Sequence, residues 1–360
     1  MKREVDIEEA LQLENVLFVD LRSESEFREA TIPGAVNLPL FDDQERARLG
    51  QVYRQAGPSA ARYLGLEISA PKLPLLIKQI SEFTRKQPVV LFCWRGGMRS
   101  ASIDAVCQLM GIPSRRLVDG YKSYRRRVYR YLWQTPVKRE AVVLHGLTGV
   151  GKTELLHELQ RIGLPAVDLE GMAGNRGSVF GGINLPDAPG QKMFEALLAD
   201  KMWSTEQYPF FLVECESRRL GKVNLPSPLL ESMQKGRKVL LYDTLENRVQ
   251  RLIKVYAEDG EKNQEQILRA LGCLKERLGG EKVKLLQDRF LEREFEEFVS
   301  TLLVEYYDPI YRYPSHPDPG YDLCIDTGNL EAALVRLKEY LARIYGFTFK
   351  KEGGEGAGNR

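Results

Sequence analysis

The chain has few of the residues that organise disulfide-rich or zinc-binding proteins. Its 360 residues include five cysteines and three histidines, and no two cysteines stand at the spacing of a zinc site or a disulfide framework. It has no apolar run long enough to cross a membrane, and its first residues lack the apolar core of a signal peptide. These absences predict a globular, cytoplasmic protein with no membrane partner.

The balance of charge gives the chain no general affinity for polyanions. Its 52 basic residues are offset by 50 acidic ones, and the formal net charge is +2 at pH 7. Binding of nucleic acid depends on the local electrostatic field rather than on the total charge. Any such site must therefore be a local basic patch.

The length is sufficient for two domains, since cores usually stop growing at about 100–200 residues. Short apolar runs at 16–20, 35–38 and 88–92 alternate with helical periodicity at 73–83. This alternation predicts buried parallel strands and an α/β fold.

A second α/β pattern follows the first. Strands are expected at 141–145, 166–168, 209–215, 238–242 and 323–325, and the stretch 245–307 is mostly helical by its periodicity. We place the domain boundary near residue 136, which gives a first domain at 1–135 and a second at 136–348. The Gly-rich and charged segment 349–360 is expected to be a disordered tail.

Cys93 is the first candidate catalytic residue. It ends an apolar strand and precedes a helix, so loop amides and the helix dipole would stabilise its thiolate. Gly96 and Gly97 allow the loop to form an anion-binding concavity, and Arg95 and Arg99 add positive charge. The alternative is a buried structural cysteine in a turn, but such a cysteine rarely needs two glycines and two arginines beside it.

Residues 1–132 resemble the rhodanese family, in which the loop cysteine carries a persulfide. The matching segments are 19–22, 26–27, 32–39, the Cys93 loop, 118–121 and Tyr124. The Cys93 loop is one residue longer than the usual rhodanese loop and has the length of the loop in rhodanese-fold phosphatases. The resemblance therefore implies either chalcogen transfer from a larger donor or dephosphorylation.

The second candidate site is the sequence 146–153, which matches the phosphate-binding P-loop between a strand and a helix. Its glycines Gly146, Gly149 and Gly151 let backbone N–H groups surround phosphate oxygens. Lys152 supplies a cation, and Thr153 can contact a phosphate oxygen or a magnesium ion.

The expected partner strand at 209–215 departs from the pattern of ATPases. It ends in glutamates, Glu214 and Glu216, where an ATPase has an aspartate that holds Mg²⁺. Either glutamate could hold a metal ion or act as a base, and surface capping is the alternative. The departure argues more against ATP hydrolysis than against diphosphate binding.

Basic residues elsewhere are candidate contacts for tRNA or diphosphate. They are Arg125, Arg126, Arg127, Arg130, Arg176, Arg218 and Arg219. Between 115 and 133 the cations alternate with aromatic residues, as in single-stranded RNA sites. The alternatives are a packed connector helix with its aromatics between domains, and solvated loop charges.

The combination of a rhodanese-like domain and a P-loop domain resembles the tRNA 2-selenouridine synthase family over nearly the whole chain. The resemblance includes 93–100, 174–182, 214–221 and 306–309. It implies replacement of sulfur by selenium in the wobble 2-thiouridine of tRNA. Selenophosphate and geranyl diphosphate would be co-substrates, and an S-geranyl nucleoside the intermediate. It implies no tightly bound cofactor, leaves Mg²⁺ open, and suggests a selenophosphate-producing partner.

Three other interpretations remain at this point. The main one is an ATP-dependent rhodanese-type tRNA sulfurtransferase. The others are a tRNA-binding adaptor with two degenerate anion sites, and a cysteine phosphatase. Intact Cys93, Lys152 and Thr153 argue against the adaptor.

Overall fold

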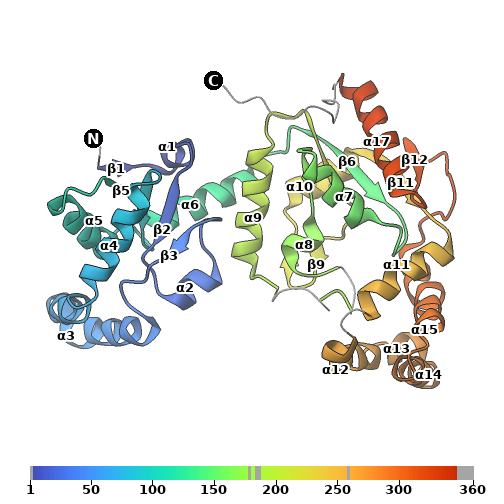
Figure 1. Cartoon of the computed structure of the whole chain (residues 1–360), viewed down its shortest axis with the longest axis horizontal. Helices are drawn as coiled ribbons and strands as arrows, with labels where there is room; N and C mark the ends of the chain where they lie inside the picture. The colour runs from blue at the N-terminus through green and yellow to red at the C-terminus, as the bar shows by residue number, and fades with distance from the viewer. Residues whose placement is uncertain (1–2, 177–179, 183–187, 258–259, 347–360) are drawn as a thin grey trace. The chain divides into compact units, whose positions relative to one another are not determined.

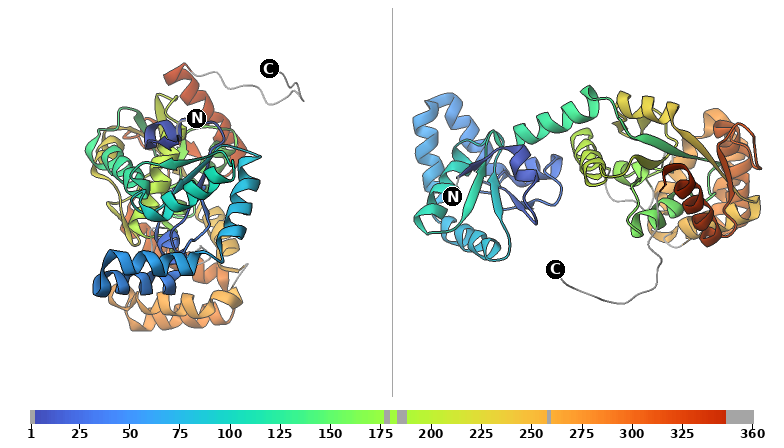
Figure 2. Two further views of the ribbon diagram at one scale, coloured as in Figure 1. Left: turned by 90° about the vertical axis from the view of Figure 1, so that its left-hand side faces the viewer. Right: turned by 90° about the horizontal axis from the view of Figure 1, so that it is seen from above.

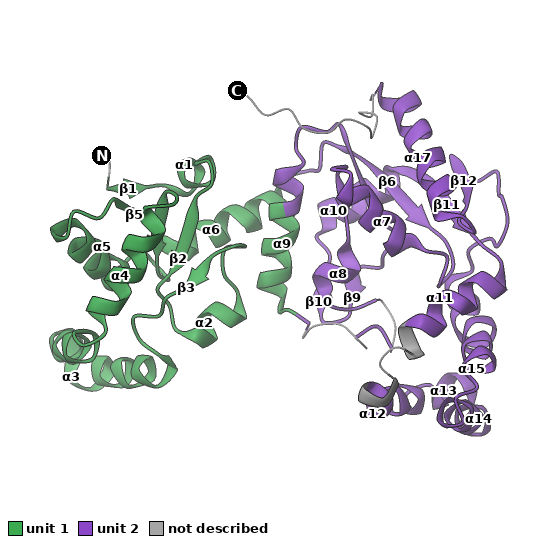
Figure 3. Ribbon diagram, viewed as in Figure 1, with its two compact units in different colours: residues 1–135, 189–200 green, residues 136–188, 201–360 purple. Residues whose placement is uncertain are grey.

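The computed structural model describes residues 3–176, 180–182, 188–257 and 260–346. It consists of two compact units, coloured separately in Figure 3. The first contains 1–135 and 189–200, and the second contains 136–188 and 201–360. The expected tail at 349–360 lies outside the described residues. No helix in the described part of the chain is long and apolar enough to span a membrane.

The first unit contains a five-stranded sheet in the order β1-β5-β4-β2-β3, and all its neighbouring strands are parallel (Figure 1). The strands are β1 (Glu4–Val5), β2 (Leu17–Asp20), β3 (Val36–Asn37), β4 (Val89–Phe92) and β5 (Ser114–Leu117). The helices are α1 (Ile7–Leu11), α2 (Glu24–Glu29), α3 (Asp43–Ser69), α4 (Leu73–Thr84), α5 (Met98–Leu109) and α6 (Gly120–Tyr129), followed by the π-helical segment η1 (Arg130–Gln134). Apolar side chains of β2, β4, α4 and α5 form its core.

The second unit contains a parallel five-stranded sheet in the order β12-β11-β6-β8-β7. The strands are β6 (Glu140–His145), β7 (Ala166–Val167), β8 (Phe210–Glu214), β11 (Arg237–Tyr242) and β12 (Leu323–Asp326), with a small antiparallel hairpin of β9 (Arg219–Leu220) and β10 (Val223–Asn224). Its other helices outside the insertion are α7 (Lys152–Arg161), α8 (Leu169–Ala173), α10 (Ser227–Lys235) and α17 (Leu330–Tyr345), while α9 (Gln191–Ser204) begins in the first unit and ends in the second.

A helical insertion between β11 and β12 has a hydrophobic core of its own. It contains α11 (Leu245–Ala257), α12 (Gly260–Gly272), α13 (Lys275–Leu278), α14 (Gly280–Leu291), α15 (Phe295–Leu302), the π-helical segment η2 (Leu303–Tyr307) and α16 (Asp308–Tyr311). The α/β class with parallel sheets, predicted from the alternating apolar runs, is confirmed.

The elements of the first unit that were not predicted include helix α3 and strand β5. Segment α3 consists of two surface helices that meet at a kink at Gly57, where the backbone is not helical, and it is drawn in blue in both views of Figure 2. Most of its side chains are exposed, so it lacks a strong apolar stripe. Strand β5 was missed because it contains Arg115 and Arg116, which form ion pairs with Glu9 and Glu4. Paired arginines thus occupy an interior strand that composition alone would not indicate.

Candidate functional site

Cys93 lies directly after β4, and α5 begins five residues later. Its side chain is only 3% exposed. The Sγ atom lies 3.2 Å from the Oγ of Ser100 and 3.9 Å from the carbonyl oxygen of Gly97. Ser100 is fully buried and was not predicted, although it stands in the sequence that drew attention to the loop. Its hydroxyl can donate to a thiolate or accept from a thiol.

The Cys93 loop is held in place by the turn before α6. Tyr121 N–H donates to the carbonyl oxygen of Cys93 at 2.8 Å, and Lys122 N–H donates to that of Trp94 at 3.0 Å. Gly120 has φ of +54°, and a Cβ there would lie 2.1 Å from the carbonyl oxygen of Cys93. A side chain would therefore push the two segments apart. This close approach explains why the rhodanese-like segment 118–121 contains glycine.

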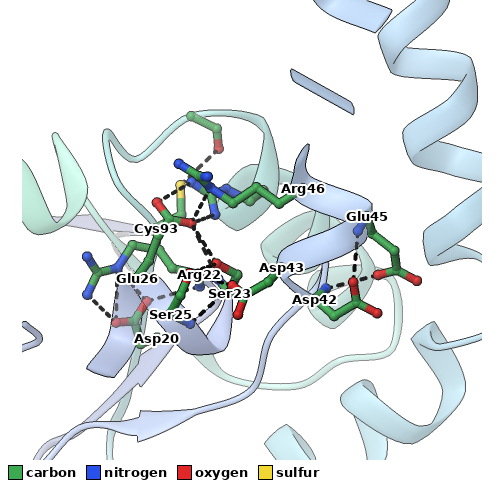
Figure 4. Close-up of polar contacts among 12 residues, drawn as sticks. Asp20, Arg22, Ser23, Ser25, Glu26, Asp42, Asp43, Glu45, Arg46 and Cys93 are labelled. Carbon is green, nitrogen blue, oxygen red and sulfur yellow. Dashed lines mark hydrogen bonds and ion pairs between the residues drawn. The ribbon is translucent and has the colours of Figure 1, made fainter. Parts of the chain in front are cut away.

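A buried ion pair supports the same region. Asp20, at the end of β2, pairs with Arg22 at 2.6 Å and accepts a hydrogen bond from Thr31. The Arg22 guanidinium lies 4.2 Å from the ring centre of Tyr121, which links the pair to the turn beneath Cys93. Figure 4 shows Asp20 and Arg22 in contact.

Arg99 is not a free cation of the Cys93 loop. Its guanidinium donates to Glu26 at 2.7 Å, and Arg46 of α3 contacts the same carboxylate at 2.9 Å; Figure 4 shows Glu26 and Arg46 in this group. Burial acts to raise the pKa of Glu26, but Arg99 and Arg46 hold it below its usual value. Arg95, the other predicted arginine, is exposed. Arg99, which was expected to add positive charge to the loop, is paired with Glu26.

The P-loop lies between β6 and α7, as predicted from the sequence. Lys152 Nζ donates to the carbonyl oxygens of Gly146 and Leu147 at 2.8 and 3.2 Å. Thr153 Oγ1 donates to Glu170 at 3.4 Å. Burial lowers the pKa of Lys152 despite nearby carboxylates. The lysine thus contacts backbone oxygens that a phosphate group could replace.

Carboxyl groups converge beside the P-loop. Glu214, the last residue of β8, is 1% exposed and accepts a hydrogen bond from the backbone N–H of Glu170 at 2.8 Å. Glu170 and Glu216 are hydrogen-bonded to each other. Burial raises the pKa of all three, and that of Glu216 reaches about 8. The surface-capping alternative is wrong for Glu214, and Glu170 is a site residue that sequence reasoning missed.

A cavity of about 320 Å³ opens onto the P-loop. Its polar wall contains Lys152, Thr153, Glu170, Glu216 and Arg176. Its apolar wall contains Leu252, Phe180, Tyr307, Tyr311 and Tyr313. The cavity therefore combines a phosphate cradle with an aromatic surface, a pairing that suits a ligand with a charged head and an apolar tail.

Comparison with known proteins identifies both parts of the chain. Residues 5–127 match the rhodanese-like domain, and residues 139–340 match the tRNA 2-selenouridine synthase AAA domain. A protein named tRNA 2-selenouridine synthase from Pseudomonas syringae pv. syringae is 35% identical, over 84% of this chain and 90% of its own. The chain belongs to the tRNA 2-selenouridine synthase family. Proteins of the same name from Hydrogenovibrio crunogenus and Pseudomonas fluorescens are 34% and 36% identical, over 85% and 82% of this chain and 91% and 87% of their own.

In this family member, two arginines of the insertion support the P-loop from outside. Arg248 donates to the carbonyl oxygen of Thr148 at 2.8 Å and pairs with Asp308. Arg251 donates to the carbonyl oxygen of Gly149 at 3.1 Å and pairs with Asp243. Sequence reasoning missed both because they lie about 100 residues beyond the loop. Asp308 belongs to the late segment that resembles the family.

The predicted basic contacts of this family member separate into paired and exposed groups. Arg125 pairs with Glu195, Arg126 with Asp119 and Arg127 with Glu8. Arg126 is exposed although it is paired, and Arg130, Arg218 and Arg219 are also exposed, while Arg176 lines the cavity. In the connector, Tyr124 and Val128 are buried. The packing interpretation therefore holds for these two side chains, and Arg125, Arg126 and Arg127 already have acidic partners.

Proposed function

We propose that this protein replaces the sulfur of wobble 2-thiouridine in tRNA by selenium, in two steps at two sites. The P-loop cavity takes geranyl diphosphate and transfers the geranyl group to the sulfur. The Cys93 site then takes selenophosphate and supplies the selenium that displaces the alkylated sulfur. The family name supports the tRNA substrate and the selenium product.

The proposed geranyl transfer is supported by the residues that line the P-loop cavity. Phe180, Tyr307 and Tyr311 form an apolar surface next to the phosphate cradle at Lys152 and Thr153. A nucleotide would need polar partners for its base and sugar, whereas a prenyl chain needs only apolar contact. Aromatic faces also stabilise the positive charge that develops on an allylic carbon as diphosphate leaves.

The proposed transfer forms a bond between the 2-thio sulfur and C1 of the geranyl group. The bond between C1 and the diphosphate oxygen breaks, and diphosphate leaves with the electron pair. The ammonium group of Lys152 would move away from the carbonyl oxygens of Gly146 and Leu147 and neutralise the negative charge of the leaving diphosphate. The base loses its N3 proton, and the carboxyl pair Glu170–Glu216 in the same cavity is the candidate acceptor.

The residues beside the P-loop also fit a magnesium ion. Mg²⁺ typically uses one or two carboxylates together with substrate phosphates and water. Thr153, Glu170 and Glu216 offer such oxygens, and one carboxylate oxygen of Glu214 has no hydrogen-bond partner among the described residues. Within the described part of the chain, no three acidic, histidine or cysteine side chains could hold a metal by themselves. Bound there, the ion would neutralise charge on the diphosphate.

In the second step, Cys93 Sγ attacks the phosphorus of selenophosphate. The phosphorus–selenium bond breaks, selenide leaves with the electron pair, and water later releases phosphate from the cysteine. Selenide bonds to C2 of the base, and geranylthiolate leaves with the electron pair of the carbon–sulfur bond. Ser100, 3.2 Å from Sγ, can hold the thiolate between these events.

The second candidate is an ATP-dependent tRNA sulfurtransferase. The observation that favours it is the presence of carboxyl groups beside Thr153, where an ATPase holds Mg²⁺. It predicts ATP turnover that tRNA stimulates, without any prenyl donor. The proposed function predicts no such stimulation.

The two steps can be tested together by mass spectrometry of tRNA nucleosides. We expect wild-type protein to make S-geranyl-2-thiouridine with geranyl diphosphate, and to convert it to 2-selenouridine when selenophosphate is added. Lys152→Ala should reduce geranylation by at least about 100-fold, and Cys93→Ala should do the same to selenium incorporation only. Unchanged geranylation in Lys152→Ala, or selenium incorporation in Cys93→Ala, would contradict the corresponding step.

A further inference from the structure

Arg46 and Arg99 converge on one carboxylate beside the Cys93 loop. Arg99 Nη1 and Arg46 Nε lie 2.7 and 2.9 Å from the same atom, Glu26 Oε2, and Figure 4 shows Glu26 and Arg46 in this group. Arg99 directly precedes Ser100, whose Oγ lies 3.2 Å from Cys93 Sγ. The group of two arginines and one glutamate therefore borders the loop that carries the sulfur.

The charges in this group do not balance. Two guanidinium groups face one carboxylate, and the N-terminus of α5 adds a further partial positive charge. The side chain of Arg46 is 51% exposed and that of Arg99 is 21% exposed, whereas that of Glu26 is 12% exposed. Both arginines are thus more accessible to solvent than the carboxylate that they share.

Guanidinium groups bind carboxylate and phosphate oxygens with the same forked geometry. A phosphate dianion offers at least one more oxygen and one more negative charge than a carboxylate. It can therefore satisfy both arginines better than Glu26 does, provided that Glu26 turns away. The same oxygen, Glu26 Oε2, lies 3.4 Å from the Ser23 N–H in the capping box of α2, so an incoming anion would have to take both arginines from the oxygen that also caps this helix.

We propose that Arg46 and Arg99 form a binding site for a tetrahedral oxyanion at the mouth of the Cys93 loop, and that Glu26 occupies this site in the empty protein. The ligand class is a phosphate-bearing donor or the phosphate product. Arg46 is then an anion-binding residue contributed by α3, which lies outside the cysteine motif. The proposal rests on the proposed use of such a donor at Cys93.

A purely structural role for Glu26 makes the opposite prediction. If Glu26 only orients Arg99 for binding, then removing its charge weakens the site. If Glu26 competes with the ligand, then removing its charge strengthens the site. Glu26→Gln separates the two, because glutamine is also a good third residue of a capping box and preserves the start of α2.

The test measures how inorganic phosphate protects Cys93 from iodoacetamide, followed by mass spectrometry of the Cys93 peptide in the full-length protein. Cys273 is exposed and lies in the other unit, so its peptide is the internal reference. The variants are Glu26→Gln, Arg46→Ala and Arg46→Lys. Arg48→Ala, also exposed on α3, is the matched control.

We expect Glu26→Gln to lower the half-protecting phosphate concentration by about tenfold and Arg46→Ala to raise it by a similar factor. The half-protecting concentration for Arg46→Lys should lie between those of wild type and Arg46→Ala, because lysine keeps the positive charge but cannot make the two parallel hydrogen bonds of a guanidinium group. The half-protecting phosphate concentration for Arg48→Ala should stay within about twofold of the wild-type value. The proposal would be overturned if phosphate protected Cys93 less well in Glu26→Gln than in wild type, or if Arg46→Ala and Arg48→Ala had equal effects. It would also be overturned if iodoacetamide modified Cys93 in none of the variants. Loss of the selenium product in wild type with normal protection would instead contradict the proposed function alone.

Discussion

At the scale of single residues, the charge of the P-loop cavity depends mainly on whether its carboxyl groups are protonated. Glu170 and Glu216 share a hydrogen bond, and burial raises the pKa of both. Lys152 acts in the opposite direction because its charge favours the ionised carboxylates. Burial wins, so this pair retains a proton near neutral pH, which leaves one carboxylate free to accept another.

This balance predicts a pH dependence of stability. The pKa of Glu216 is about 8 in the folded protein and near 4.5 as a free side chain. The folded state therefore binds the proton more tightly, and the stability that this supplies at low pH is lost as the pH rises through about 8. Glu216→Gln should remove this loss, and its melting temperature relative to wild type should rise by a few degrees between pH 5 and pH 8.5.

Thermal unfolding of both proteins across this pH range checks the prediction. Glu231→Gln changes an exposed glutamate of α10 and serves as the control, with an expected melting profile parallel to wild type. A Glu216→Gln profile that also runs parallel to wild type would show that burial does not shift this carboxyl group.

At the scale of elements, helix α11 determines the shape of the P-loop from outside the motif. Arg248 is buried and joins the loop to α16, since it donates to Thr148 and pairs with Asp308 at 2.5 Å. Removing one member of such a buried ion pair destabilises a protein more than replacing both members by apolar residues, because the remaining charge is left buried without a partner. The helical insertion is therefore part of the phosphate site. The aspartate of its segment 306–309 is explained by the ion pair of Asp308 with Arg248, which contacts the P-loop.

A double-mutant cycle on this pair gives a quantitative prediction. Arg248→Ala and Asp308→Ala should each lower the free energy of unfolding of the second unit by about 2–4 kcal/mol. The double variant should lose less than the sum, with a coupling of about 1–3 kcal/mol. Arg269→Ala, which breaks an exposed pair with Glu265, should cost less than about 0.5 kcal/mol. Additive losses in denaturant titrations would refute the coupling.

At the scale of the whole molecule, the two units are interleaved along the chain. Residues 189–200 pack with residues 1–135, whereas the segments before and after them belong to the second unit. The division made from the sequence assigned 189–200 to the second domain. Contacts explain the difference, because Glu195 of α9 accepts from Trp133 Nε1 at 3.0 Å and pairs with Arg125.

Glu195 should therefore affect the stability of the first unit although it lies 60 residues beyond Thr135, where the N-terminal part of that unit ends. Glu195→Ala should lower the free energy of unfolding of this unit by about 2–4 kcal/mol, because the half-buried Arg125 and the indole N–H of Trp133 both lose their partner. Glu195→Gln should cost less, since its amide oxygen still accepts from Trp133. Unfolding followed by tryptophan fluorescence measures both, and Lys192→Ala, in an exposed pair with Glu29, is the control. Equal losses in all three variants would contradict this role.

The sequence by itself determined what depends on neighbouring residues. Apolar runs identified the main strands, including β4 and β6, because parallel strands are buried on both faces. The cysteine loop and the P-loop were found because backbone amides bind anions only when glycines and the functional side chains follow one another closely. The same motifs were sufficient to indicate the family that the comparisons confirm.

Only the tertiary structure decided which charges meet. Arg99 was expected to add positive charge to the Cys93 loop, and the fold pairs it with Glu26, 73 residues earlier, which also contacts Arg46. Glu170 and Glu216 come together through the order of β7, β8 and β6 in the sheet. Coulomb interactions depend on distance in space and on burial, and neither can be read from position along the chain. The chemical groups are therefore visible in the sequence, while their partners and protonation are set by the fold.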